Sequence, residues 1–129
     1  MYDPIIFSAY STSGNFGTGS YITGFTGFLT NVGESFKLAD GTFKAPRNGI
    51  YEFSASVSHD HSSDDLAAMK NQEQVLQINL WWASTNGFNW IMELQKGDQV
   101  QLQVKAGQFT CNAGNNCIFN GKIIRDITY

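Results

Sequence analysis

The sequence predicts an all-β protein, built as an antiparallel two-sheet sandwich or jelly roll of about ten short strands. The first observation is spacing, because short apolar or alternating segments recur along the 129 residues between clusters of Gly, Asn, Asp and Ser. The second is composition, with ten Phe, five Tyr, thirteen Gly and only two Pro, which is typical of many strands and turns. Regularly spaced short strands favour a sandwich or a jelly roll.

Length and charge limit the domain organisation and the classes of partner. A chain of this length forms one domain, residues 1–129, and its apolar content of 42% can supply a core without a metal. The net charge of −3 argues against nucleic acid as a partner, because binding phosphates needs clustered Lys and Arg.

No apolar run approaches the roughly eighteen residues of a membrane span. The N-terminal MYDPIIF lacks a charged leader with a long apolar centre, so a secreted form would have lost its signal peptide or would be a segment of a longer chain.

The first thirty residues predict two extended segments separated by a loop. Residues 4–10 alternate and predict a first strand, with Ile6, Ser8 and Tyr10 on one side. The next ten residues, STSGNFGTGS, are so rich in Ser, Gly and Thr that a surface loop is expected over 11–20. Extended structure is expected again over 21–30.

Residues 25–53 predict short strands joined by tight turns, because six aromatic side chains alternate there with turn-forming clusters. The six are Phe25, Phe28, Phe36, Phe43, Tyr51 and Phe53. Asp40-Gly41 favours a two-residue hairpin turn, in which both central residues need positive φ. Residues 50–57 then alternate, and the side carrying Tyr51, Phe53, Ala55 and Val57 is expected to face the core.

The second half predicts four further strands after an irregular connection. Residues 59–65, HDHSSDD, are expected to form a polar loop, and LAAMK within 66–72 favours at most one helical turn. The strands are expected at 74–82, 88–94, 99–105 and 118–127, with turns at 84–87 and 96–98. In 99–105, Val100, Leu102 and Val104 are expected to point inward. Apolar residues on both sides of 118–127 predict a strand covered by the core and by a neighbouring subunit.

Seven residues in the segment 25–53 have a spacing that resembles the signature of the complement C1q globular-head family. They are Phe25, Asn31, Phe36, Phe43, Gly49, Tyr51 and Phe53, and Ala55 replaces the aromatic with which the signature ends. Shorter matches at 7–9, 94–100 and 119–121 extend the resemblance over most of the chain. The resemblance implies a ten-strand jelly roll like that of tumour necrosis factor, a homotrimer, an extracellular location and a binding role. A closed trimer would bury an apolar sheet edge, whereas a monomeric sandwich is the alternative.

The two cysteines, Cys111 and Cys117, enclose five residues between two strands. A disulfide would close this loop and stabilise the fold by about 2 kcal/mol in the loop-entropy model, and it is favoured in an extracellular protein. A reduced pair and a soft metal site are the alternatives, although a metal site would need further Cys or His ligands.

The segment after residue 57 contains a candidate metal site. His59 and His61 fall on the same side of a strand end, and Asp65 follows four residues later, as in jelly-roll oxygenases. Those sites need a third His, and this chain has only two. A solvated acidic loop is therefore the preferred interpretation, with weak calcium or zinc binding as the alternative.

The resemblance suggests a second calcium position at Asp98 and Gln99, because several relatives hold calcium near the trimer axis with an Asp and a Gln in this motif. The next loop supplies Asn112, Asn115 and Asn116 where calcium would prefer carboxylates. A plain hairpin-turn role for Asp98 is preferred, and no cofactor is expected to be required.

Aromatic side chains with a polar atom are the candidate ligand contacts, because a ring face accepts the apolar side of a sugar. The candidates are Tyr21, Trp81, Trp82 and Trp90. Adjacent Trp residues on one strand cannot both point inward, so one would meet solvent or a partner subunit, and trimer packing is the commoner explanation. No nucleophile elbow, phosphate-binding loop or Cys-His pair is found, so an enzyme is not expected.

Two functional classes remain. The first is an extracellular trimeric recognition module that binds carbohydrate, microbial-surface or protein ligands through several weak sites at once. The second is a structural module that trimerises an attached stalk or coats a surface without a dedicated small ligand. Ligand binding by an intact trimer would separate the two classes.

Overall fold

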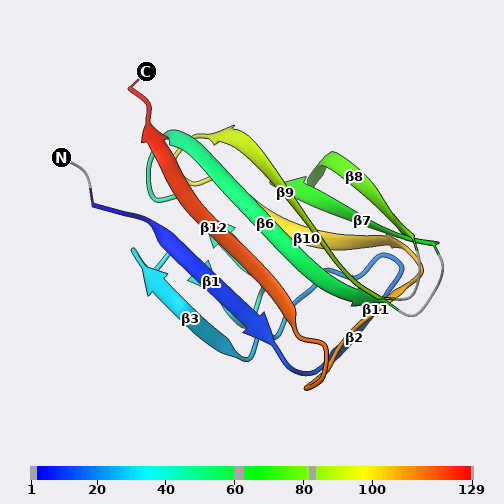
Figure 1. Ribbon diagram of the computed structural model, residues 1–129. Coiled ribbons are helices and arrows are strands. Elements are labelled where there is room, and N and C mark those ends of the chain that lie inside the picture. The colour runs from blue at the N-terminus through cyan, green and yellow to red at the C-terminus, as the bar shows by residue number, and fades with distance from the viewer. Residues whose placement is uncertain (1–2, 60–62, 82–83, 129) are drawn as a thin grey trace.

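The computed structural model describes residues 3–59, 63–81 and 84–128, which form twelve strands in two antiparallel sheets (Figure 1). The strands are β1 (Ile6–Ser11), β2 (Gly14–Gly17), β3 (Gly27–Val32), β4 (Phe36–Lys37), β5 (Thr42–Lys44), β6 (Gly49–His59), β7 (Ser63–Lys70), β8 (Glu73–Trp81), β9 (Ser84–Leu94), β10 (Gln99–Ala106), β11 (Gln108–Cys111) and β12 (Cys117–Asp126). The described part of the chain contains no helix with the length and apolar character of a membrane span.

The first sheet has seven strands and is centred on β6, the long strand predicted at 50–57. Strand β6 pairs with β9 along one edge and with β12 along the other, and β12 continues to β1 and β3. At its end β6 also meets β11, which pairs with β2. The second sheet has five strands in the order β4, β5, β10, β7 and β8. Figure 1 shows β1, β12, β6 and β9 side by side in front of β10, β7 and β8.

Aromatic rings fill the space between the two sheets. Phe43 on β5 is fully buried, and its ring centroid lies 5.4 Å from Phe7 of β1, 5.3 Å from Tyr51 and 5.2 Å from Phe53 of β6. One residue of the second sheet therefore contacts two strands of the first. Tyr51 also donates a hydrogen bond to the Arg47 carbonyl oxygen at 2.7 Å. Burial is the main cause of the raised pKa of Tyr51.

The alternation of side chains along the predicted strands identified the buried faces correctly. Tyr51, Phe53, Ala55 and Val57 are all buried, as expected for the core face of β6. Val100, Leu102 and Val104 are likewise buried on β10. In the first strand Phe7 and Ala9 are buried, while Ile6 on the opposite side is 39% exposed.

Residues 66–72 differ from the prediction, because they belong to strand β7 and its turn rather than to an irregular connection. Ala67 and Ala68 are both completely buried within a strand that has hydrogen-bonded neighbours on both edges. Packing between β10 and β8 therefore outweighs the helix preference of Leu, Ala and Met. The β7–β8 turn uses Asn71 and Gln72, both at positive φ.

Four turn and loop predictions are also corrected. Asp40-Gly41 is not a two-residue hairpin turn, because β4 and β5 are joined by four residues and only Gly41 of this pair has positive φ. Residues 11–20 include the short strand β2, and residues 84–87 lie within β9. The turn at 96–98 connects β9 of one sheet to β10 of the other, so it does not close a hairpin.

Candidate functional site

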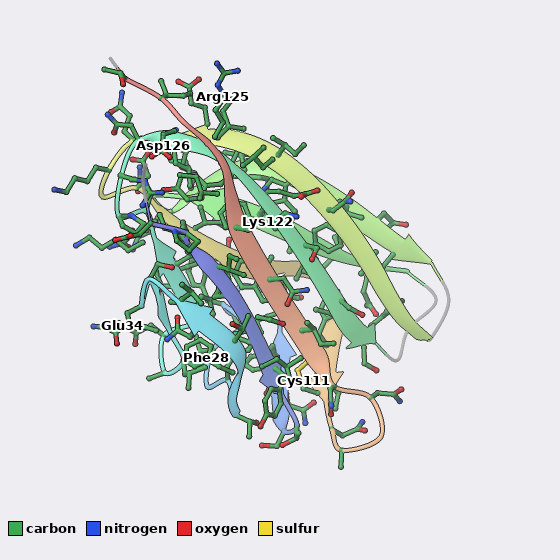
Figure 2. The ribbon with its side chains drawn as sticks, turned by 60° about the vertical axis from the view of Figure 1, so that its left-hand side comes forward. Phe28, Glu34, Cys111, Lys122, Arg125 and Asp126 are labelled. Carbon is green, nitrogen blue, oxygen red and sulfur yellow. A yellow bond between two sulfur atoms is a disulfide. The ribbon has the colours of Figure 1, made fainter. Side chains whose placement is uncertain are left out.

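The face of the first sheet turned away from the core carries a row of five residues, one from each of five neighbouring strands. Strand pairing places Val32, Ile6, Lys122, Glu52 and Ile91 next to one another in that order. Lys122 and Glu52 form an ion pair at 3.6 Å in the centre of the row. The apolar side chains on either side are exposed, at 41% for Val32 and 61% for Ile91. Figure 2 shows Lys122 midway along β12.

The next row of the same face is polar, and its side chains bind one another. Strand pairing aligns Thr30, Ser8, Asn120, Ser54 and Asn89. The Ser8 hydroxyl donates to Asn120 Oδ1, and Asn120 Nδ2 donates to Ser54 Oγ at 3.1 Å. Side chains bonded in this way are held in place before any partner arrives. The face therefore combines ordered polar groups with exposed apolar groups, which suits contact with another protein surface.

Two residues of the expected polar loop at 59–65, His59 and Asp64, lie in the protein interior. His59 at the end of β6 and Asp64 on β7 are both buried, with no side-chain exposure, and His59 Nδ1 lies 2.9 Å from Asp64 Oδ2. This hydrogen bond connects the two sheets. The interpretation of these two residues as part of a solvated loop is therefore wrong, because the pair is enclosed by the core.

The predicted metal ligands near His59 do not converge in the described residues. Asp65 follows Asp64 on a strand, so its side chain points to the opposite face, where Gln77 and Asn79 donate hydrogen bonds to it. His61 lies outside the described residues. Among the described residues, no group of three or more His, Cys, Asp or Glu side chains is placed to hold a metal ion.

Asp98 stabilises the turn between β9 and β10. Burial raises its pKa, but donors from Asn71 and the Gln95 N–H, together with the Lys70 ammonium at 3.7 Å, outweigh burial and lower the pKa overall. This stabilisation is complete above the ordinary Asp pKa and is lost as the pH falls through the lowered value.

The residues around Asp98 do not fit the calcium site suggested by the resemblance. Both carboxylate oxygens already accept hydrogen bonds, and a cation, Lys70, lies beside them. Asn112 and Asn115 lie beyond the other end of β10 and bond to each other through their backbones. Calcium would therefore lack a set of free, charged oxygens at this turn.

Cys111 and Cys117 form a disulfide, which confirms the preferred interpretation of this pair. The bond joins the end of β11 to the start of β12. Both cysteines are buried, while the five residues between them are exposed. Figure 2 shows Cys111 far along the sheet from Arg125 and Asp126.

The family model of the C1q domain matches residues 6–124, which is nearly the whole chain. The chain belongs to the C1q domain family. This match confirms the resemblance seen in the spacing of Phe25, Phe36, Phe43 and Tyr51. A comparison of the whole chain with curated protein sequences gives no match.

Solved structures confirm the jelly-roll fold. The globular domain of the zebrafish complement 1qA protein is 19% identical, covers 95% of this chain and 99% of that chain, and has a TM-score of 0.77. Murine APRIL at pH 5.0 is 10% identical over 94% and 99% of the two chains, with a TM-score of 0.72. The Eiger TNF of S. frugiperda is 10% identical over 97% and 96%, with a TM-score of 0.69. At these identities the likeness establishes the C1q and tumour necrosis factor fold alone.

The candidate aromatic ligand contacts do not form one surface. Trp90 is buried in the core, with its ring stacked on Phe53 at 5.5 Å and on Phe88 at 5.4 Å, so its assignment to ligand binding is wrong. Tyr21 is half-buried and pairs with Gln103 beside β10. The side chain of Trp81 and all of Trp82 lie outside the described residues.

Sequence reasoning placed Ile6 on the side opposite Phe7 but missed its partners in the row, Val32 and Ile91. Each is one apolar residue at an outward position of its own strand, which is unremarkable by itself. These three residues are recognised as a row only when strand pairing is known, because the pairing aligns them across the sheet.

Proposed function

We propose that this C1q domain is an extracellular, homotrimeric recognition module that binds carbohydrate, microbial-surface or protein ligands and does not catalyse a reaction. The observation that supports trimer formation is the row of exposed apolar side chains, Val32, Ile6 and Ile91, on a rigid sheet face. C1q and tumour necrosis factor relatives are trimers. Two further copies of this chain are therefore the partners that the face fits.

Assembly around a three-fold axis explains why such a face is tolerated. Each copy would cover part of the row of its neighbour. The ring closes after three copies, so no exposed apolar interface remains to add further copies. The Lys122–Glu52 ion pair in the middle of the row lies within one chain, so a neighbouring copy could cover both charges without leaving either of them unpaired.

Trimerisation supports recognition because it presents three copies of any ligand site together. Once one site of the trimer has bound a ligand with repeated groups, the second and third sites bind at a high effective concentration. The overall affinity can then exceed that of a single site by about 10²–10⁴. No cofactor is required by this proposal. A cofactor-free mode of binding stays a prediction.

We expect Ile91→Lys to convert the trimer to a monomer that remains folded. Ile91 is 61% exposed on the isolated chain, so a lysine there costs the monomer little, but the trimer would bury its charge. Val75→Lys is the matched control, because Val75 is 45% exposed on β8 of the other sheet. Sedimentation equilibrium should give a trimer for the control. A trimeric Ile91→Lys variant would contradict this placement of the interface.

The recognition role is tested by comparing wild type, Ile91→Lys and Val75→Lys on an array of glycans, microbial polysaccharides and protein ligands. We expect the two trimers to bind and the monomer to lose most of the binding. A trimer that binds nothing on such an array would support the alternative, a structural trimerisation or coat module.

A further inference from the structure

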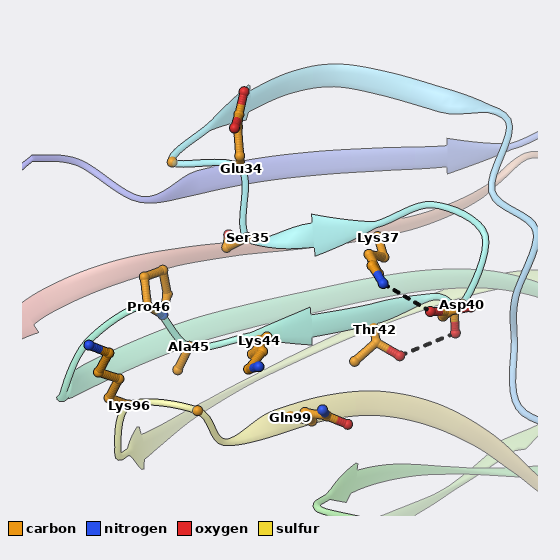
Figure 3. Close-up of a pocket in the computed structure, with 12 residues that line it drawn as sticks. Glu34, Ser35, Lys37, Asp40, Thr42, Lys44, Ala45, Pro46, Lys96 and Gln99 are labelled. Atoms are coloured by element: carbon orange, nitrogen blue, oxygen red, sulfur yellow. Dashed lines mark hydrogen bonds and ion pairs between the residues drawn. The ribbon is translucent and has the colours of Figure 1, made fainter.

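An open groove of about 750 Å³ lies on the second sheet, at the ends of β4 and β5 and beside the turn at 96–98. This volume is typical of small-ligand sites, which measure about 300–1,000 Å³. Strand pairing sets Lys37 opposite Thr42, and Lys44 opposite Gln99, along its wall. Figure 3 shows these side chains together with Lys96 from the neighbouring turn.

Backbone hydrogen bonds make the wall of the groove rigid. Ala45 N–H donates to the Asp98 carbonyl oxygen at 2.9 Å, and Gly97 N–H donates to the Ala45 carbonyl oxygen at 2.8 Å. Lys44 N–H donates to the Ser35 carbonyl oxygen at 2.9 Å. Lys44 and Lys96 are therefore carried by segments that are fixed relative to each other.

The lining is basic, although the whole chain is acidic. The lining contains three lysines and two carboxylates, whereas the whole chain has a net charge of −3. The lysines are Lys37, Lys44 and Lys96, and the carboxylates are those of Glu34 and Asp40. Lys37 lies 4.0 Å from Asp40 in an exposed ion pair that contributes little and can open. Figure 3 shows the Glu34 carboxylate pointing away from Lys44 and Lys96. No ion pair forms at these two lysines within the described part of the chain.

A buried hydroxyl in the lining also lacks a partner. Ser35 is 8% exposed, and its Oγ is fully buried without a hydrogen bond to any described residue. Buried hydroxyls are normally hydrogen-bonded, because an unpaired one costs free energy. A ligand with acceptor oxygens would supply the missing bond.

We propose that this groove binds acidic polysaccharide, with a carboxylate or sulfate group between Lys44 and Lys96 and a sugar oxygen accepting from Ser35. Lysine provides a compact charge for single anionic oxygens, and Thr42 and Gln99 can bond to sugar hydroxyls. The described lining contains no aromatic ring, so it does not offer the stacking surface used for neutral sugars. This inference rests on the proposed recognition role and names its ligand class.

Lys44 and Gln99 of the groove lie on the second sheet, whereas the apolar row lies on the outward face of the first, so this part of the groove stays accessible in the proposed trimer. Three grooves per trimer would engage repeated acidic groups along one polymer. Acidic polymers fit this arrangement, since they present a negative charge on many successive sugars.

The test measures trimer binding to immobilised heparin, which is sulfated, polygalacturonate, which is carboxylated, and dextran, which is neutral. We expect binding to one or both acidic polymers and none to dextran. Lys44→Gln should weaken that binding about fivefold, whereas Lys105→Gln, which removes the same charge farther along the second sheet, should change it less than twofold. Ser35→Ala should weaken binding without lowering the free energy of unfolding, because its hydroxyl has no bond to lose within the fold.

Each other outcome overturns a different claim. Equal binding by wild type, Lys44→Gln and Lys105→Gln would remove the groove as the site. Binding to dextran or other neutral glycans, with none to acidic polymers, would overturn the ligand class and leave the recognition role intact. A trimer that binds no polysaccharide or protein ligand would overturn both proposals.

Discussion

Asp64→Ala should lower the free energy of unfolding by about 3 kcal/mol, because it leaves buried His59 without the carboxylate that lies 2.9 Å from its Nδ1. The backbone of Gly107 packs closely against the Asp64 carboxylate, since a Cβ on Gly107 would lie 1.7 Å from Asp64 Oδ1. Little rearrangement can therefore compensate for the loss. Urea unfolding followed by tryptophan fluorescence measures the change.

The double variant His59→Leu/Asp64→Leu is the control for this prediction. Replacing both members of the pair with apolar side chains leaves neither one buried without the other, so its loss should be clearly smaller than that of Asp64→Ala. A loss under about 1 kcal/mol for Asp64→Ala would show that the pair contributes little to holding the sheets together.

Phe43→Ala should lower the free energy of unfolding by about 3–5 kcal/mol, the range for removing a fully buried aromatic ring. Phe43 contacts Phe7, Tyr51 and Phe53, so its loss opens a cavity between the two sheets. The same urea titration applies, and an unchanged m value would show that the denatured state is unaffected.

Leu29→Ala is the matched control for Phe43→Ala, because Leu29 is a large apolar residue that is 72% exposed on β3. Its change should stay within about 0.5 kcal/mol. If Phe43→Ala costs no more than Leu29→Ala, the aromatic cluster does not hold the sheets together as described.

The sequence predicted the buried faces of the fold because two-residue alternation directly reports which side of a strand is covered. Residues 50–57 and 99–105 both show this pattern, and their core residues are correct. The spacing of Phe36, Phe43 and Tyr51 also predicted the family. These signals are local, so no knowledge of strand pairing was needed.

The predictions that failed depended on contacts between distant segments. Residues 66–70 favour a helix locally, yet they form a strand because β10 and β8 flank it. Gly14–Gly17 pairs with β11, almost a hundred residues later, which the Ser- and Gly-rich sequence gives no reason to expect. His59 looked solvated because the segment that follows it is polar, yet β6 and β7 bring it against Asp64 in the interior.

The functional surfaces were the hardest to predict for the same reason. Ile6, Val32 and Ile91 form a row only through the register of five strands. Lys44 and Lys96 are 52 residues apart, and they line one groove because β5 meets the turn before β10. Trp90, one of the four aromatic candidates for ligand contact, is buried in the core.

The mass of the wild-type domain at micromolar concentration, measured by sedimentation equilibrium, tests most directly whether three copies of this chain assemble. The expected mass is three times the 14.3 kDa of one chain. A mass of 14.3 kDa at every concentration would contradict the trimer, and with it the multivalent recognition that depends on it.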